Sequence, residues 1–286
     1  MLAQQPMARE SLTSVGPDTG AQANAGLSLT STGGDTYTAK MVNGVHYPIG
    51  QEAWSIKTDY YLDTFVHYLP NIIAALQQSG NEVKRVLEIG VARGVLSIGI
   101  ALLTDDDTQI IGIDIEEKAH ALVTQNALTN GVQHKIEVRI GDMFTPVRPG
   151  ETFDLIIGEL PIIPVDPIKQ QQYIAEGYAS EILNISGGAN GRDFVDALIA
   201  QGAAFLNPGG AVVLIQPSFI GVEETLQRCA HAGLQGTVLV SKAWRLDDTK
   251  FTRNNKEYIE RTTGYIFPKN SAGEDVFFLT IIKGVK

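Results

Sequence analysis

One stretch, residues 85–94, constrains the fold of this chain more than any other. It reads Arg-Val-Leu-Glu-Ile-Gly-Val-Ala-Arg-Gly, and it joins a short apolar run to an acidic residue, Glu88, and to two glycines four positions apart. The apolar run is typical of a buried strand, and residues 95–103 supply the apolar helix that must follow it. Glycines in the turn can adopt positive φ and let a ligand approach the backbone closely. The first N–H groups of the following helix would face the same ligand. The stretch therefore predicts a strand, turn and helix that bind a cofactor.

Three later apolar runs also end in acidic residues, namely Asp114, Asp142 and Glu159. In an open parallel sheet the carboxyl ends of the strands share one crevice, so we expect these residues and Glu88 to converge on one ligand site. Asp114 follows Gly90 by 24 residues, a spacing at which a carboxylate can accept hydrogen bonds from both hydroxyls of a ribose. Taken singly, such residues are commonly helix caps or solvated loop residues, but the ordered set of four favours a binding site.

With these motifs the chain resembles the class I S-adenosylmethionine-dependent methyltransferases, roughly over residues 80 to 220. The resemblance implies an α/β fold with a seven-stranded, mostly parallel, Rossmann-like sheet and helices on both faces. It also implies S-adenosyl-L-methionine as the cofactor, with its methionine part against the turn, its ribose on the second strand and its adenine after the third. The cofactor-binding residues would then be Glu88, Gly90, Val91, Ala92, Gly94, Asp114, Ile115, Asp142 and Met143. Ala92 stands where the family has the central glycine of the turn.

Within that class the chain is most similar to the branch of the release-factor glutamine methyltransferases and related amino-group N-methyltransferases. Asn43-Gly44 indicates a two-residue hairpin ahead of the first helix, and Gly187-Gly188 opens a glycine-rich segment as in that branch. We expect a flexible tail over residues 1–35, a hairpin and helix cap over residues 36–80, and the catalytic domain over residues 81–286.

The Asn-Pro-Pro-Tyr that this branch carries after its fourth strand is replaced here by Glu159, Leu160, Pro161 and Ile162. A carboxylate accepts hydrogen bonds but cannot donate them, so it favours a nucleophile with several N–H donors. The loop resembles the acidic loop of arginine guanidinium methyltransferases, with Asp166 in the place of their second glutamate. We therefore expect an N-methyltransferase that acts on an amine or guanidine nitrogen of a small molecule, with free arginine or a related amino acid as the first candidate. Glu159 and the carbonyl of Leu160 would be its catalytic groups.

Further residues are expected to contact the substrate. Some precede or begin the first helix, and the others belong to the long segment between residues 159 and 191, because loops of this length are often lids. The expected set is Trp54, Asp59, Tyr60, Tyr61, Pro161, Asp166, Tyr173 and Tyr178. Each of these side chains has an alternative role in the core or in surface packing.

The composition narrows the choice of partners. A formal net charge of −10 is opposite to the basic surface that phosphate backbones require, so no nucleic-acid partner is expected. Cys229 is the single cysteine and none of the five histidines has metal-ligand spacing, so no metal is expected. No apolar stretch is long enough to span a membrane, which predicts a cytoplasmic protein without a membrane partner, and a homodimer is left open.

Three other functions remain open. A nicotinamide-dependent oxidoreductase would need a G-x-G-x-x-G turn, which residues 90–95 do not supply. A non-catalytic S-adenosylmethionine-binding protein would keep the cofactor residues alone. A protein glutamine N-methyltransferase would keep the cofactor residues and methylate an amide.

Overall fold

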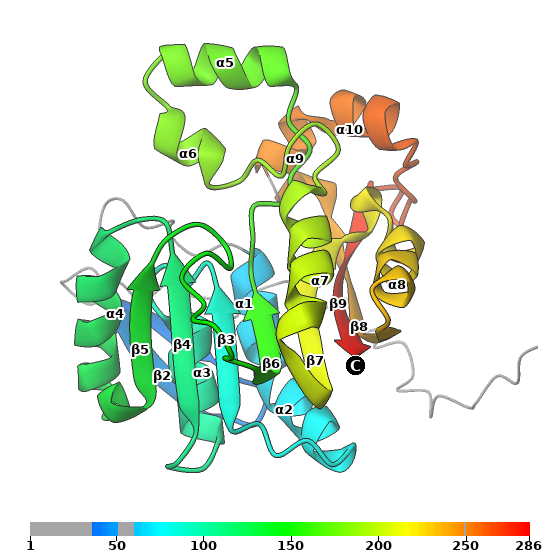
Figure 1. The fold of residues 1–286 in the computed structure, drawn as a ribbon. Coiled ribbons are helices and arrows are strands. Elements are labelled where there is room, and N and C mark those ends of the chain that lie inside the picture. Colours follow the sequence, from blue (N-terminus) through cyan, green and yellow to red (C-terminus); the bar gives the residue numbers. More distant parts are fainter. Residues whose placement is uncertain (1–35, 51–59, 249) are drawn as a thin grey trace, which may run out of the picture. The chain divides into compact units, whose positions relative to one another are not determined.

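A computed structural model describes residues 36–50, 60–248 and 250–286 (Figure 1). Trp54 and Asp59, which the sequence places near the substrate, lie outside the described residues. The described residues belong to one compact unit, and the residues before and after position 80 share one hydrophobic core. The expected domain boundary at that position stays a prediction.

A seven-stranded sheet in the order β5-β4-β3-β6-β7-β9-β8 forms the centre of this unit. Neighbouring strands from β5 to β7 are parallel, and β9 runs antiparallel to both of its neighbours, which confirms the predicted fold class. The chain runs from β3 outward to β5 and then returns to β6, so the strand order reverses between β3 and β6. In open α/β sheets, ligands bind at such a reversal, outside the carboxyl ends of the strands. The strands of this sheet are β3 (Arg85–Ile89), β4 (Gln109–Asp114), β5 (Ile136–Ile140), β6 (Phe153–Gly158), β7 (Leu206–Pro217), β8 (Gln235–Arg245) and β9 (Val276–Val285).

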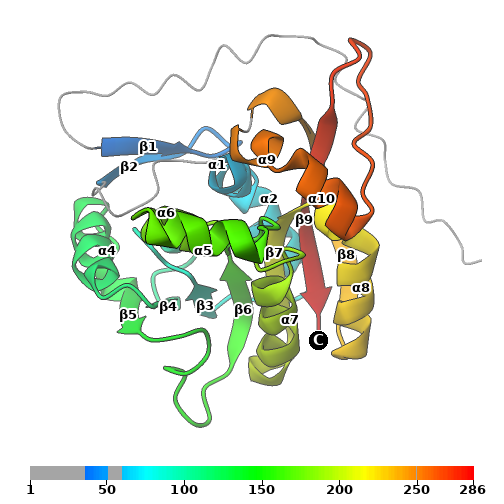
Figure 2. The ribbon, with the colours of Figure 1, turned by 90° about the horizontal axis from the view of Figure 1, so that it is seen from above.

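Helices cover both faces of the sheet (Figures 1 and 2). On one face lie α1 (Tyr60–His67), α2 (Leu69–Gln78) and α3 (Val95–Leu103), and the other face carries α7 (Asp193–Phe205) and α8 (Val222–His231). Helix α4 (Lys118–Thr129) packs on β5, and α9 (Lys250–Asn254) and α10 (Lys256–Thr263) lie between β8 and β9 in the chain. Single turns of 3-10 helix span Gln133–Lys135, Ser218–Ile220 and Leu246–Asp248.

The core follows from two sequence patterns. β3, β4 and β6 are covered on both faces, so they are almost continuously apolar rather than alternating. Across α1 and α2, Phe65, Leu69, Ile72 and Leu76 recur at intervals of three or four residues, and all four are fully buried. Such a stripe places one face of the helical segment against the sheet.

A hairpin is present as β1 (Thr36–Lys40) and β2 (His46–Gly50), and Gly44 in its turn has φ of +85°. Its turn is longer than the predicted two residues, because the outermost backbone bond joins the Met41 N–H to the Val45 carbonyl at 2.8 Å. The hairpin is fixed to the turn between β3 and α3. The Tyr47 hydroxyl donates a hydrogen bond to the Val95 carbonyl at 2.7 Å. The side chain of Asn126 bonds both the N–H and the carbonyl of Gly50, at 2.7 and 3.2 Å, and donates to the Arg93 carbonyl at 3.0 Å.

Between β6 and α7 the chain forms two further helices, α5 (Pro167–Ala175) and α6 (Ala179–Leu183). Both views place this pair over the carboxyl ends of the parallel strands (Figures 1 and 2). The long segment after β6 therefore occupies the position that a lid would take.

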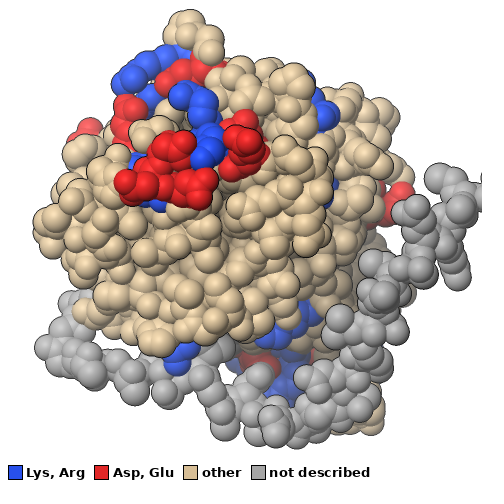
Figure 3. All heavy atoms as spheres, turned by 90° about the horizontal axis from the view of Figure 1, so that it is seen from below, with Lys and Arg blue, Asp and Glu red and all other residues tan. Residues whose placement is uncertain are grey.

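The opposite end of the molecule carries mixed charge. Seen from below, acidic and basic side chains lie together in clusters (Figure 3). At the amino ends of β3 and β4, Lys84 forms ion pairs with Asp105 at 2.8 Å and Asp107 at 2.7 Å. Among the described residues, no helix combines the length and the apolar character needed to cross a bilayer.

Candidate active site

The turn between β3 and α3 is tight and is bound to the end of β4. The backbone N–H groups of Gly90 and Val91 both donate to the carbonyl of Ile113, at 2.8 and 3.0 Å. Gly90 and Gly94 have φ of +79° and +80°, a region that favours glycine. A Cβ on Gly90 would lie 3.3 Å from the carbonyl oxygen of Glu159, so glycine here lets the loop after β6 approach the turn.

Asp114 at the end of β4 organises this turn. Its Oδ2 accepts a hydrogen bond from the N–H of Ala92 at 2.7 Å, and its Oδ1 accepts one from the N–H of Glu116 at 2.9 Å. Partial burial raises the pKa of Asp114, and the bonds from Glu116 and Ala92 act in the opposite direction. The adjacent Ile115 is 74% exposed, so an apolar side chain is presented beside the carboxylate.

Glu88 lies inside the protein. It is 2% exposed, and it accepts hydrogen bonds from the Ser97 N–H at 2.9 Å and from the Ser97 hydroxyl. Burial raises the pKa of Glu88 to about 8, although both bonds from Ser97 oppose the shift. The structure thus directs this carboxyl group toward the first turn of α3.

The end of β5 lies next to the end of β4, because the N–H of Gly141 donates to the Asp114 carbonyl at 2.8 Å. Asp142 follows as an exposed residue, and the half-buried Met143 has φ of +46°. The residues predicted to hold ribose and adenine are therefore brought to one edge of the sheet.

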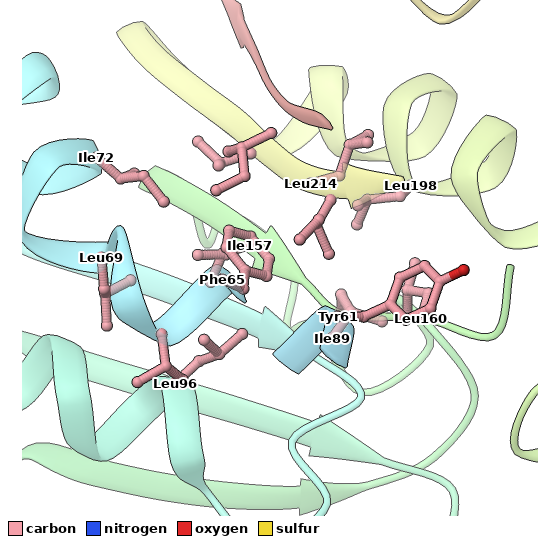
Figure 4. Packing of buried hydrophobic residues seen from close by; sticks show 14 of the residues in the cluster. Tyr61, Phe65, Leu69, Ile72, Ile89, Leu96, Ile157, Leu160, Leu198 and Leu214 are labelled. Carbon is pink, nitrogen blue, oxygen red and sulfur yellow. The ribbon is translucent and has the colours of Figure 1, made fainter. Parts of the chain in front are cut away.

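The loop after β6 begins with Glu159, which is half-buried, and continues into the buried Leu160. Tyr61 of α1 belongs to the same buried cluster as Ile89 and Leu160, and Figure 4 draws these three side chains close together. Tyr60 begins the same helix. Helix α1 is thereby brought to the loop that carries the predicted catalytic residues.

The glycine-rich segment before α7 holds this loop in place. Ile163 donates its N–H to the carbonyl of Ile185 at 2.9 Å and accepts from the N–H of Gly187 at 3.0 Å. A Cβ on Gly187 would lie 2.8 Å from the Pro161 carbonyl, and one on Gly191 would lie 2.6 Å from the Ile162 carbonyl. No local sequence motif indicates this contact, which depends on two segments that meet only in the folded chain.

Asp166, which the sequence places near the substrate, is the N-cap residue of α5 in the structure. Its side chain caps α5 by accepting the N–H of Ile168 at 2.9 Å, and Arg261 lies 3.9 Å away. Asp166 followed by Pro167 is a local capping signal that could have indicated this role from the sequence. Tyr173 and Tyr178 are 39% and 54% exposed on the helical pair above the strand ends.

Comparison with known proteins agrees with this geometry. A family model described as O-methyltransferase matches residues 72–174. A provisionally named protein N5-glutamine methyltransferase of Methanocaldococcus jannaschii is 30% identical over 57% of this chain and 82% of its own length. A release factor glutamine methyltransferase of Clostridium acetobutylicum is 25% identical, and the chain spans only 46% of it. One solved structure, a provisionally named methyltransferase complexed with SAH, shares the fold with a TM-score of 0.50, 14% identity, and coverage of 87% of this chain and 56% of its own.

The chain therefore belongs to the S-adenosylmethionine-dependent methyltransferases, in the family of the protein N5-glutamine methyltransferases. S-adenosylmethionine is its cofactor, and the described residues fit that molecule. Asp114 would supply a carboxylate for the ribose hydroxyl groups, and the exposed Ile115 and half-buried Met143 would supply apolar surface for the flat base.

One expectation from the sequence is wrong. We expected an amine or guanidine of a small molecule, such as free arginine, as the methyl acceptor and partner. The relatives are instead named as glutamine methyltransferases of proteins, among them a release factor. The inference failed because the carboxylate of Glu159 was taken to require a cationic acceptor, whereas a neutral amide also offers two N–H donors.

A first prediction concerns Asp114. Replacing Asp114 with alanine is expected to weaken the binding of S-adenosylhomocysteine by roughly tenfold to a hundredfold, the usual cost of losing a charged hydrogen-bond acceptor. The turn would also lose the acceptor of the Ala92 N–H. Isothermal titration calorimetry measures the change, and Asp107→Ala, at the other end of β4, is the control. Equal affinity of wild type and Asp114→Ala would remove Asp114 from the binding site.

Proposed function

We propose that this chain methylates the side-chain amide nitrogen of a glutamine residue in a protein. The observation that carries the proposal is the position of Glu159 and Leu160. They follow β6 directly beside the cofactor-binding turn, where the Glu159 carbonyl and Gly90 are in close contact. The similarity to protein glutamine methyltransferases supports a protein amide as the acceptor.

An amide nitrogen carries two hydrogens and is a weak nucleophile, because its lone pair is delocalised onto the carbonyl. In this proposal the Glu159 carboxylate accepts one N–H and the Leu160 carbonyl accepts the other, which fixes the nitrogen in line with the methyl group. Correct placement of the two reactants alone can lower the activation barrier by on the order of 7–11 kcal/mol in ideal cases. The cofactor supplies an electrophilic methyl group on a sulfonium.

The carboxylate has a second role in the proposal. As the nitrogen gains the methyl group it becomes acidic, and Glu159 is placed to stabilise the developing positive charge and to accept the proton. The amide that the family carries at this position could also donate to the substrate carbonyl, whereas a carboxylate cannot. The donor for that carbonyl must therefore come from another group of this chain or of the substrate.

The helical pair α5–α6 supports a polypeptide as substrate. No side chain of α5 is buried. The pair presents five large apolar or aromatic residues over the carboxyl ends of the strands, each between 39% and 68% exposed: Ile168, Tyr173, Ile174, Tyr178 and Leu183. The pair is also joined to the rest of the site, because the Ser186 hydroxyl donates to the side chain of Gln170 at 3.0 Å. An extended apolar surface fits the side chains that flank a glutamine in a protein better than it fits a free amino acid.

The proposal is tested by the destination of the methyl group. The purified chain would be incubated with methyl-labelled S-adenosylmethionine and with separate protein, RNA and metabolite fractions. We expect label in the protein fraction. Label confined to the RNA or the metabolites would contradict the proposal.

A second prediction concerns the helical pair. Tyr178→Ser is expected to raise the KM for the protein substrate about tenfold, the scale of one aromatic contact in an interface, and to leave the affinity for S-adenosylhomocysteine unchanged. Leu128→Ser is the matched control, because Leu128 is equally exposed, at 55%, but lies near the far end of α4. An unchanged KM in Tyr178→Ser, or the same rise in Leu128→Ser, would exclude Tyr178 as a substrate contact.

A further inference from the structure

Helix α5 contains three consecutive glutamines, Gln170, Gln171 and Gln172. The α5–α6 pair lies over the carboxyl ends of the parallel strands, the end of the sheet at which the loop with Glu159 begins (Figures 1 and 2). The proposed function makes the side-chain amide of a glutamine the methyl acceptor. The chain therefore carries the proposed acceptor group at the same end of the sheet as its own candidate active site.

Two of these three amides are exposed. Gln170 is half-buried, and its side-chain oxygen accepts a hydrogen bond from the hydroxyl of Ser186 at 3.0 Å. Gln171 and Gln172 are exposed, and no residue from position 166 to position 179 is buried. The amides of Gln171 and Gln172 can thus leave their positions without the loss of a packed contact.

The helix that carries these glutamines depends on few tertiary contacts. It spans nine residues, its N-cap is Asp166, and it packs on the five-residue helix α6. Helices of this length are marginal in water unless burial of one face stabilises them, and α5 buries no side chain. Segments with few buried contacts open locally at a small cost in free energy. We therefore expect α5 to unwind while the sheet stays folded.

The connection from α5 to the candidate active site is short. The buried Val165, whose N–H donates to the Gly188 carbonyl at 3.1 Å, is the last anchored residue before α5. Glu159 precedes Val165 by six residues, and Gln171 follows it by six. Six extended residues span at most about 22 Å, so an unwound α5 gives Gln171 enough chain to return to Glu159. A tether of this length keeps the amide at an effective concentration on the order of millimolar.

We propose that the chain methylates its own Gln171 or Gln172 in an intramolecular reaction. This inference rests on the proposed function. The amide nitrogen forms a bond to the methyl carbon while the bond from that carbon to the sulfonium sulfur breaks. Glu159 takes the proton that the nitrogen loses, and S-adenosylhomocysteine is the second product.

The test is mass spectrometry of the chain itself. The purified full chain would be incubated with methyl-labelled S-adenosylmethionine alone and digested, and fragment ions would locate the label. Label is expected at Gln171 or Gln172, and at neither Gln77 nor Gln78, a second exposed pair of helical glutamines. That second pair lies at the opposite end of the sheet, because it ends α2, which leads into the start of β3. The labelled fraction at a fixed time should not change when the chain is diluted about tenfold, since the reaction is intramolecular.

Two double variants give a matched comparison. Gln171→Ala combined with Gln172→Ala is expected to remove the label from the chain, and Gln77→Ala combined with Gln78→Ala is expected to keep it. Alanine is at least as good a helix former as glutamine, so both pairs of substitutions preserve their helices. Glu159→Ala should slow the labelling of the chain by about a hundredfold, because the same carboxylate takes up the proton.

Failure of this inference is distinguishable from failure of the proposed function. Methylated glutamine in the protein fraction without label at Gln171 or Gln172 would overturn the inference and leave the proposed function intact. The absence of methylated glutamine from both the chain and the protein fraction would contradict both. Equal label at Gln77 or Gln78, or a labelled fraction that falls in proportion to dilution, would overturn the intramolecular reaction at α5.

Discussion

Replacing Glu159 with alanine is expected to lower the turnover number for the protein substrate by about a hundredfold or more, the scale of lost general-base and electrostatic help. The substitution removes the anionic acceptor of the amide N–H and of its proton. The affinity for S-adenosylhomocysteine should change by no more than about twofold, because Glu159 acts on the acceptor in this proposal and not on the cofactor.

Glu159→Gln sharpens this prediction. The glutamine side chain keeps an oxygen that accepts an N–H, as the amide of the family does at this position, but it cannot take up a proton. Glu159→Gln should therefore retain at least about tenfold more activity than Glu159→Ala. Glu223→Ala, an exposed glutamate in the first turn of α8, is the matched control. Single-turnover rates of all four proteins decide the point, and wild-type turnover in Glu159→Ala would exclude a catalytic role.

Glu88 should make the stability of the chain depend on pH. Burial raises its pKa to about 8 in the folded chain, against an ordinary glutamate value of 4.5. Between these two values the folded chain holds a proton that the unfolded chain has lost, so rising pH favours unfolding. The contribution of Glu88 is fully present at and below pH 4.5 and is lost as the pH rises toward 8.

Glu88→Gln cannot lose this proton. Relative to wild type, its free energy of unfolding is expected to rise by about 3 kcal/mol between about pH 5.5 and pH 8, since one pKa unit corresponds to about 1.4 kcal/mol. Urea denaturation at the two pH values, without cofactor, measures the difference. Glu223→Gln should show no such trend. A constant difference between Glu88→Gln and wild type at both pH values would show that Glu88 titrates normally.

Local sequence signals were sufficient to predict the turn after β3 and the acidic residue at the end of β4. The turn at Gly90 and the acidic residue at Asp114 each follow a strand whose apolar run is unmistakable, and parallel pairing brings their ends together. The direction of Glu88 could not be predicted in the same way. β3 is buried on both faces, so its sequence does not alternate and does not indicate which face the carboxyl group takes.

The substrate side of the site depends on contacts between distant segments. Gly187 and Gly191 hold the loop after β6 across a separation in sequence that no local pattern encodes. The sequence indicated that a hydrogen-bond acceptor, the carboxylate of Glu159, follows β6. A single acceptor group does not distinguish an amide substrate from a guanidine substrate. The relatives, rather than the residue, corrected that interpretation.

The most direct test of the proposed function is the position of the methyl group in the product. Proteins labelled by the purified chain would be digested, and fragment-ion mass spectrometry would locate the added methyl. The proposed function predicts one methyl group on the side-chain nitrogen of a glutamine, and labelled methylamine after acid hydrolysis. A methyl group on lysine, on arginine or on an oxygen atom would contradict it.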